Sequence, residues 1–140
     1  MKAQDVEYIV THCSDTKWDH DVDADDIRDW HIAKGWSDIG YHFVIRLDGT
    51  IETGRSLATE GAHARGYNDR SVGVCLVGGK GLDGLPSSDY NMLQMESWTK
   101  LCETLEKIFP KALMVGHNDL TDVKTCPNFD VKEYWRLFGK

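Results

Sequence analysis

The sequence predicts an α/β fold in which a central mixed sheet of about five strands is covered by helices. β-branched, apolar runs alternate along the chain with segments of helical periodicity. An Asp-Gly pair inside one apolar stretch indicates a hairpin, which makes part of the sheet antiparallel. No repeat or proline-rich linker interrupts the 140 residues, so we expect one domain over residues 1–140.

The first strand and the first helix follow each other near the N-terminus. Residues 8–13 read YIVTHC, a β-branched and apolar run that predicts a strand. Residues 23–34 predict a helix, because Asp23 can cap its first turn and acidic residues follow at its positive end. Ile27 and Trp30 stand at helical spacing, and we expect both to face the core.

A hairpin and a buried strand come next. Residues 41–46 and 50–53 predict two strands, joined by the turn-forming pair Asp48-Gly49. Residues 72–77 read VGVCLV, without a polar side chain. Such a run is typical of a central strand that is buried on both faces.

The second half of the chain predicts a long helix, a short strand and a last helix. Residues 88–109 form the long helix, with Ser88 as its cap. Its apolar side chains recur at helical spacing. They are Trp98, Leu101, Cys102, Leu105, Ile108 and Phe109. Residues 112–115 predict the strand, and residues 130–138 predict the last helix.

The composition argues against two classes of partner. The chain has 16 basic and 23 acidic residues and a net charge of -7, which gives no electrostatic basis for binding nucleic acid or an anionic membrane. No stretch approaches the roughly 18 apolar residues of a membrane span. The first residues lack the apolar segment of a secretory signal, so we expect synthesis in the cytoplasm without a signal peptide.

Three residues have the chemistry of a metal site. His12 and His117 each stand at the carboxyl end of a predicted strand, where ligands collect in α/β sheets. Cys126 lies in the loop that follows. Two imidazoles and a thiolate suit a tetrahedral zinc ion with one position open for water. A structural role remains the alternative for each, because a lone histidine often packs and a buried cysteine often acts as a small hydrophobe.

The other histidines and cysteines are interpreted as structural. Side chains alternate between the two faces of a strand, so Cys13 points away from His12, and His42 points away from Tyr41. We therefore expect Cys13 and His42 to pack. The remaining residues of these types are interpreted as core, packing or solvated, namely Cys75, Cys102, His31 and His20.

Several segments resemble those of a known family, in order and over nearly the whole chain. They are residues 10–14, 27–31, 35–43, 48–50, 61–68, 71–79, 116–117 and 124–127. With them the chain resembles the zinc amidases of the N-acetylmuramoyl-L-alanine amidase type, which include phage amidase-type lysozymes and the animal peptidoglycan recognition proteins. The short phage enzymes that consist of this domain alone are the best likeness.

The resemblance implies roles for particular residues. It implies zinc held by His12, His117 and Cys126, with a water in the remaining position. It places Tyr41 and Lys124 beside the metal as catalytic residues. It also puts a histidine near the substrate groove, and the same segment supplies candidate substrate-binding residues. These candidates are His63, Arg65 and Asn68.

The resemblance further implies hydrolysis of the amide bond between N-acetylmuramic acid and L-alanine in bacterial peptidoglycan. Zinc would lower the pKa of water and polarise the carbonyl. The charge of Lys124 would stabilise the oxyanion, and the Tyr41 hydroxyl would bind the water or the oxyanion. The general acid stays open between Tyr41, Lys124 and water. We expect a monomeric phage or prophage endolysin, made in the host cytoplasm and acting on the cell wall; an interbacterial effector or a recycling enzyme would have much the same sequence.

Three alternatives stay open. Some recognition proteins bind peptidoglycan without cutting it, but they characteristically lack the cysteine ligand, and Cys126 is present here. Some phage relatives also bind their phage RNA polymerase, and the resemblance leaves that partner undecided. Thiol catalysis by Cys13 with His12 is disfavoured, because neighbouring side chains on a strand point apart.

Overall fold

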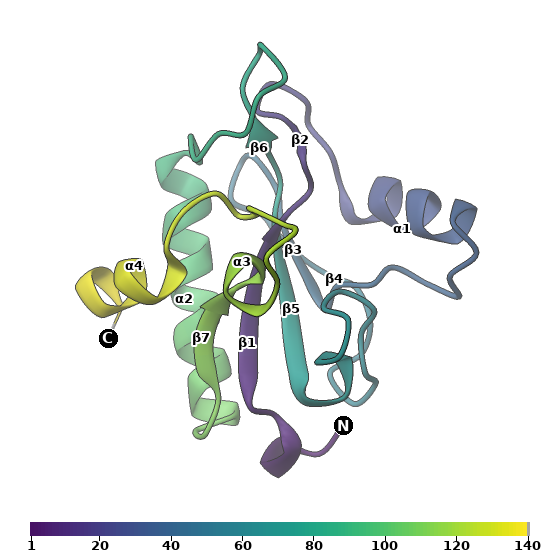
Figure 1. Ribbon diagram of the computed structural model, residues 1–140, viewed down its shortest axis with the longest axis vertical. Helices are drawn as coiled ribbons and strands as arrows, with labels where there is room; N and C mark the ends of the chain where they lie inside the picture. Colours follow the sequence, from purple (N-terminus) through teal and green to yellow (C-terminus); the bar gives the residue numbers. More distant parts are fainter. Residues whose placement is uncertain (140) are drawn as a thin grey trace.

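The computed structural model describes residues 1–139 and contains the mixed sheet that the sequence predicts. Its five strands lie in the order β4-β3-β5-β1-β7, and only the β3–β4 pair is antiparallel. The strands are β1 (Tyr8–Cys13), β3 (Phe43–Ile45), β4 (Ile51–Thr53), β5 (Ser71–Leu76) and β7 (Leu113–Gly116). The first strand of the chain is therefore an inner strand, between β5 and β7 (Figure 1).

Helices cover both faces of this sheet (Figure 1). They are α1 (Ala24–Ala33), α2 (Met92–Ile108), the short α3 (His117–Leu120) and α4 (Val131–Phe138). Two 3₁₀ turns, η1 (Ala3–Asp5) and η2 (Asn68–Arg70), precede β1 and β5. A second, two-stranded parallel sheet of β2 (Thr16–Lys17) and β6 (Gly79–Lys80) is an addition that the sequence pattern did not indicate.

Two hydrophobic clusters explain the layering. The larger lies between the sheet and α2 and α4, with the fully buried Trp98 at its centre. Trp98 also donates from its indole nitrogen to Thr11 Oγ1 at 3.0 Å, which ties α2 to β1. The smaller cluster joins α1 to the other face through Ile27, Val44 and Cys75. The alternation along the strands thus gives each face its own core.

The start of one helix and the exposure of two helical side chains differ from the sequence prediction. Helix α2 begins at Met92 and not at Ser88, because the Asn91 side chain caps it in a reciprocal pair with Gln94. Ile108, in its last turn, is 45% exposed, while Phe109 is buried as predicted. Trp30 is 44% exposed, because the buried side of the short α1 is centred on Ala24, Ile27 and His31.

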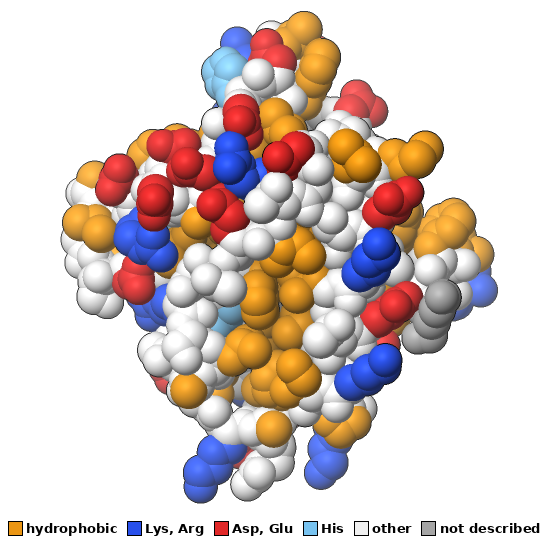
Figure 2. Space-filling model, turned by 180° about the vertical axis from the view of Figure 1, so that it is seen from behind, with side chains coloured by type: hydrophobic (Ala, Val, Ile, Leu, Met, Phe, Trp, Pro, Cys, Tyr) orange, Lys and Arg blue, Asp and Glu red, His pale blue; other side chains and the backbone are white. Residues whose placement is uncertain are grey.

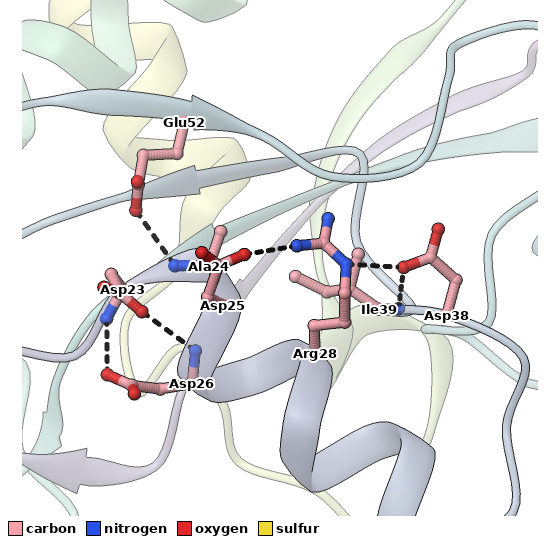
Figure 3. A network of polar contacts seen from close by, with 8 residues as sticks. All are labelled: Asp23, Ala24, Asp25, Asp26, Arg28, Asp38, Ile39 and Glu52. Carbon is pink, nitrogen blue, oxygen red and sulfur yellow. Dashed lines mark hydrogen bonds and ion pairs between the residues drawn. The ribbon is translucent and has the colours of Figure 1, made fainter.

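Polar contacts fix the start of α1 against the hairpin (Figure 3). Asp23 caps the helix as predicted, and its carboxylate accepts from the Asp26 backbone amide at 2.8 Å. The Glu52 side chain on β4 accepts from the Ala24 amide at 2.9 Å. Arg28 donates to Asp38 at 2.7 Å in the segment that leads to β3. These contacts hold α1 beside the edge strand, although the helix is short.

The surface agrees with the acidic composition. Figure 2 shows the back of the molecule, where hydrophobic side chains form a strip through the middle with charged side chains on both sides. Many of the acidic side chains gather on the side of α1, whose first two turns contain three aspartates. Among the described residues, no helix combines the length and the apolar character that a membrane span requires.

Candidate active site

Two histidines meet where β1 and β7 end. His12 lies near the carboxyl end of β1, and His117 is the first residue of α3, directly after β7. The parallel pairing of β1 and β7 sets Thr11 opposite Gly116. The residues that follow these two in the sequence are His12 and His117. Their ring centroids are 4.5 Å apart. His12 is only 2% exposed, whereas His117 is half-buried.

The loop after α3 brings Cys126 to the same place. The Asn118 amide donates to the Cys126 carbonyl at 3.0 Å, and the Asn118 side chain donates to Thr125 O at 3.2 Å. Asn128 anchors the other side of the loop by donating to Gly79 O at 2.9 Å. As a result the Cys126 Sγ lies 3.5 Å from His117 Nδ1.

The three side chains predicted as ligands therefore converge. Within the described part of the chain, one ligand atom from each of His12, His117 and Cys126 lies within 4.8 Å of the others. Burial lowers the pKa of both histidines, which keeps their imidazoles neutral and able to offer a lone pair. The donor set of two nitrogens and one sulfur fits zinc.

Cys13 is buried as expected, but it is not remote from the site. Its thiol shares a hydrogen bond with Cys126, and this contact is the main cause of a lowered pKa at Cys13. The alternation rule holds along β1, yet the strand ends here, and the Cys126 loop folds over its tip. Cys75 and Cys102 are fully buried, as predicted. All four cysteines are free thiols.

Tyr41 lies next to His12, and the charge of Lys124 acts on His117. The Tyr41 ring lies 5.1 Å from the His12 ring, and burial raises the pKa of its hydroxyl well above the usual value. The hydroxyl is therefore a hydrogen-bond donor at neutral pH. Lys124 is exposed. The pKa of His117 is lowered mainly by the burial of His117 itself, and the positive charge of Lys124 lowers it further. Lys124 also lines a hollow of about 730 Å³ together with Ser88 and Asn118, and none of the three predicted ligands lines that hollow.

The three candidate substrate-binding residues have different surroundings. His63 is 9% exposed and lies behind His12, with 2.8 Å between His63 Nδ1 and His12 Nε2. Asn68 Oδ1 accepts from the backbone amides of His63 and Ala64, so this side chain shapes the loop. Only Arg65 is exposed. Sequence reasoning gave no role to Asn118 or Ser71, which support the site through hydrogen bonds. Ser71 begins one of the family segments, whereas Asn118 lies outside all of them.

Comparison with known proteins places this geometry in a family. Residues 2–129 match the family model described as N-acetylmuramoyl-L-alanine amidase. The chain belongs to this amidase family. It is 44% identical to the endolysin of Klebsiella phage KP32 over 134 residues, which cover 96% of this chain and 88% of that protein.

Solved structures of the family share its fold. The N-acetylmuramoyl-L-alanine amidase LysC from Clostridium intestinale URNW superposes with a TM-score of 0.81 at 31% identity, over 99% of this chain and 89% of that one. Drosophila PGRP-LB superposes with a TM-score of 0.73 at 29% identity, over 95% and 81% of the two chains. The fold and family that the sequence motifs predicted are thus confirmed.

Proposed function

We propose that this amidase is a zinc-dependent phage endolysin that cleaves the bond between N-acetylmuramic acid and L-alanine in peptidoglycan. The observation that carries the proposal is the convergence of His12, His117 and Cys126 in a member of the amidase family. The endolysin relatives, which the chain matches over most of their length, support the phage role and an action on the cell wall.

The proposed ligands leave part of the coordination shell to water and substrate. Three protein ligands are the number found in catalytic zinc sites, whereas structural sites have four. A bound zinc ion supplies Lewis acidity, which lowers the pKa of water and polarises the scissile carbonyl. The exposed flank of His117 and Cys126 gives the substrate a route to this position, since neither residue is fully buried.

The chain's own residues supply the rest of the chemistry. The protonated Tyr41 hydroxyl, beside His12, donates a hydrogen bond to the oxygen on which negative charge develops. Lys124, whose charge already acts on His117, attracts that oxygen or the lactyl end of the substrate. Arg65 is the one candidate substrate-binding residue with an exposed side chain, and we propose that it contacts the glycan or the stem peptide.

Digestion of purified peptidoglycan tests the proposed function. We expect the protein to release free stem peptides whose new amino terminus is L-alanine, as identified by mass spectrometry. A chelator should stop the release, and added zinc should restore it. The His117→Ala variant should bind no zinc and release nothing. Undiminished cleavage with the metal removed, or products cut within the glycan, would contradict the proposal.

A further inference from the structure

A chain of buried hydrogen bonds leads away from His12 into the interior. His12 Nε2 lies 2.8 Å from His63 Nδ1. On the other side of that ring, His63 Nε2 lies 3.2 Å from Ser71 Oγ. Ser71 Oγ in turn donates to the backbone carbonyl of Tyr67 at 2.7 Å. All three side chains in this series are buried.

The direction of every bond follows from the last one. A carbonyl oxygen can only accept, so the single hydroxyl proton of Ser71 is committed to Tyr67. Ser71 Oγ must then accept from His63, which places the ring proton of His63 on Nε2. A neutral imidazole has one donor and one acceptor, so His63 Nδ1 accepts from His12. The ring proton of His12 is therefore on Nε2, and its Nδ1 carries the free lone pair.

We infer that His63 is a positioning residue which, through Ser71, holds His12 in the tautomer and orientation that present Nδ1 to the metal. The inference rests on the proposed zinc site. It replaces the expectation that His63 binds substrate, because both of its ring nitrogens already have partners inside the protein. Metal-bound histidines commonly donate their second ring N–H to a fixed partner. Here a second histidine takes the place of the carboxylate or carbonyl that usually accepts this bond.

The fold keeps a narrow slot for this ring. A Cβ atom at Gly73 on β5 would lie 2.6 Å from His63 Cγ, and one at Gly61 would lie 2.6 Å from His63 Cδ2. Any side chain at either position would push the ring aside. The ring is also perpendicular to that of His12, with centroids 4.9 Å apart. The ring of His63 is thus fixed by packing as well as by hydrogen bonds.

The wild-type protein gives the most direct test. Long-range ¹H–¹⁵N NMR of the imidazoles distinguishes a protonated ring nitrogen from a bare one. In the metal-free protein we expect His12 and His63 both to carry their proton on Nε2. On titration with zinc, His12 should keep that proton, and the metal should perturb its Nδ1 signal. Loss of the His12 Nε2 proton on binding, or a proton on His63 Nδ1, would overturn the inference.

Variants test the same bond through metal affinity. In His63→Leu the acceptor is lost, and we expect the zinc dissociation constant from chelator competition to rise about 10- to 100-fold. In His63→Asn the side-chain oxygen can stand where Nδ1 stood, so much of the affinity should return. His42→Leu is the matched control, since His42 is buried and bonded at both nitrogens, to Thr59 O and Gly73 N. It should lower the melting temperature but leave zinc affinity unchanged.

These outcomes separate the inference from the proposed function. A wild-type protein that binds no zinc would defeat the proposed cofactor. Zinc bound tightly by wild type and by His63→Leu alike would leave the proposed function standing and defeat the positioning role. An equal loss of affinity in His63→Leu and His42→Leu would also defeat it, because the loss would then follow from general destabilisation.

Discussion

The histidines of this chain differ in role because their ring nitrogens meet different partners. His12 and His117 each have a ring nitrogen in the cluster with Cys126. Both ring nitrogens of His42 form hydrogen bonds with backbone atoms instead. His31 accepts from the Gly40 amide at 2.8 Å, and His20 is exposed. The residue type gave no means of telling these roles apart; the partners did.

Tyr41 and Lys124 are the two residues that we propose to act in catalysis without binding the metal. The Tyr41→Phe and Lys124→Ala variants should keep zinc at wild-type affinity, because neither side chain is a proposed ligand. Each should lower kcat about 100-fold or more, since each removes one stabilising group from the developing oxyanion. Zinc content and turnover on purified peptidoglycan check both statements. Lys132→Ala, an exposed lysine on α4, is the control and should be silent.

Physical reasoning from the sequence identified only some of the proposed ligands. Strand ends pointed to His12 and His117, but nothing in the spacing joined them to Cys126; the family motifs did that. Alternation along β1 predicted a packed Cys13, and it could not show that the Cys126 loop closes over the strand tip. The family resemblance put His63 near the substrate groove, and the slot that holds its ring depends on glycines in two separate segments.

Elements show the same mixture of success and failure, and α2 is the clearest case. Apolar spacing predicted the helix correctly, yet Ser88 was the wrong cap. Both Ser and Asn cap helices well, but a capping box also needs Glu or Gln three residues later. Asn91 has Gln94 at that position, whereas Ser88 has Asn91. The fuller motif would have selected the start that the structure has.

The difference between Asn91 and Ser88 as caps of α2 can be measured as a difference in stability. Asn91→Ala should lower the free energy of unfolding by about 1 kcal/mol, because it leaves the Gln94 amide in the first turn of α2 without its partner. Asn91 also donates to Leu47 O at 2.7 Å, which adds to the loss. Ser88→Ala should change stability by less than about 0.5 kcal/mol. Urea denaturation of the two variants compares them, and equal effects would mean that Ser88 does contribute to the cap.

At the scale of the whole molecule, buried neutral histidines make stability depend on pH. Burial lowers the pKa of His31 to about 4, and it also lowers the pKa of His42. An unfolded chain binds protons at these residues near pH 6.5, and the folded chain resists them. The contribution of these buried histidines to the free energy of unfolding is therefore fully present above about pH 6.5 and is lost as the pH falls toward 4.

Denaturation of the metal-free protein at several pH values tests this dependence. For His31 alone, the free energy of unfolding should fall by about 2 kcal/mol between pH 7 and pH 5. In His31→Asn, whose side-chain oxygen can still accept from Gly40, the fall should be smaller by that amount. The same slope in both proteins would assign the pH dependence to other groups.

The sheet order has a consequence for synthesis. Tyr8–Cys13 is made first, but both of its neighbours in the sheet, Ser71–Leu76 and Leu113–Gly116, leave the ribosome long afterwards. Such distant pairings fold slowly compared with local ones. The nascent chain consequently has no complete set of proposed ligands until Cys126, far from His12 in the sequence, has been added. Incomplete chains that lack Cys126 should therefore hold no zinc at the proposed site.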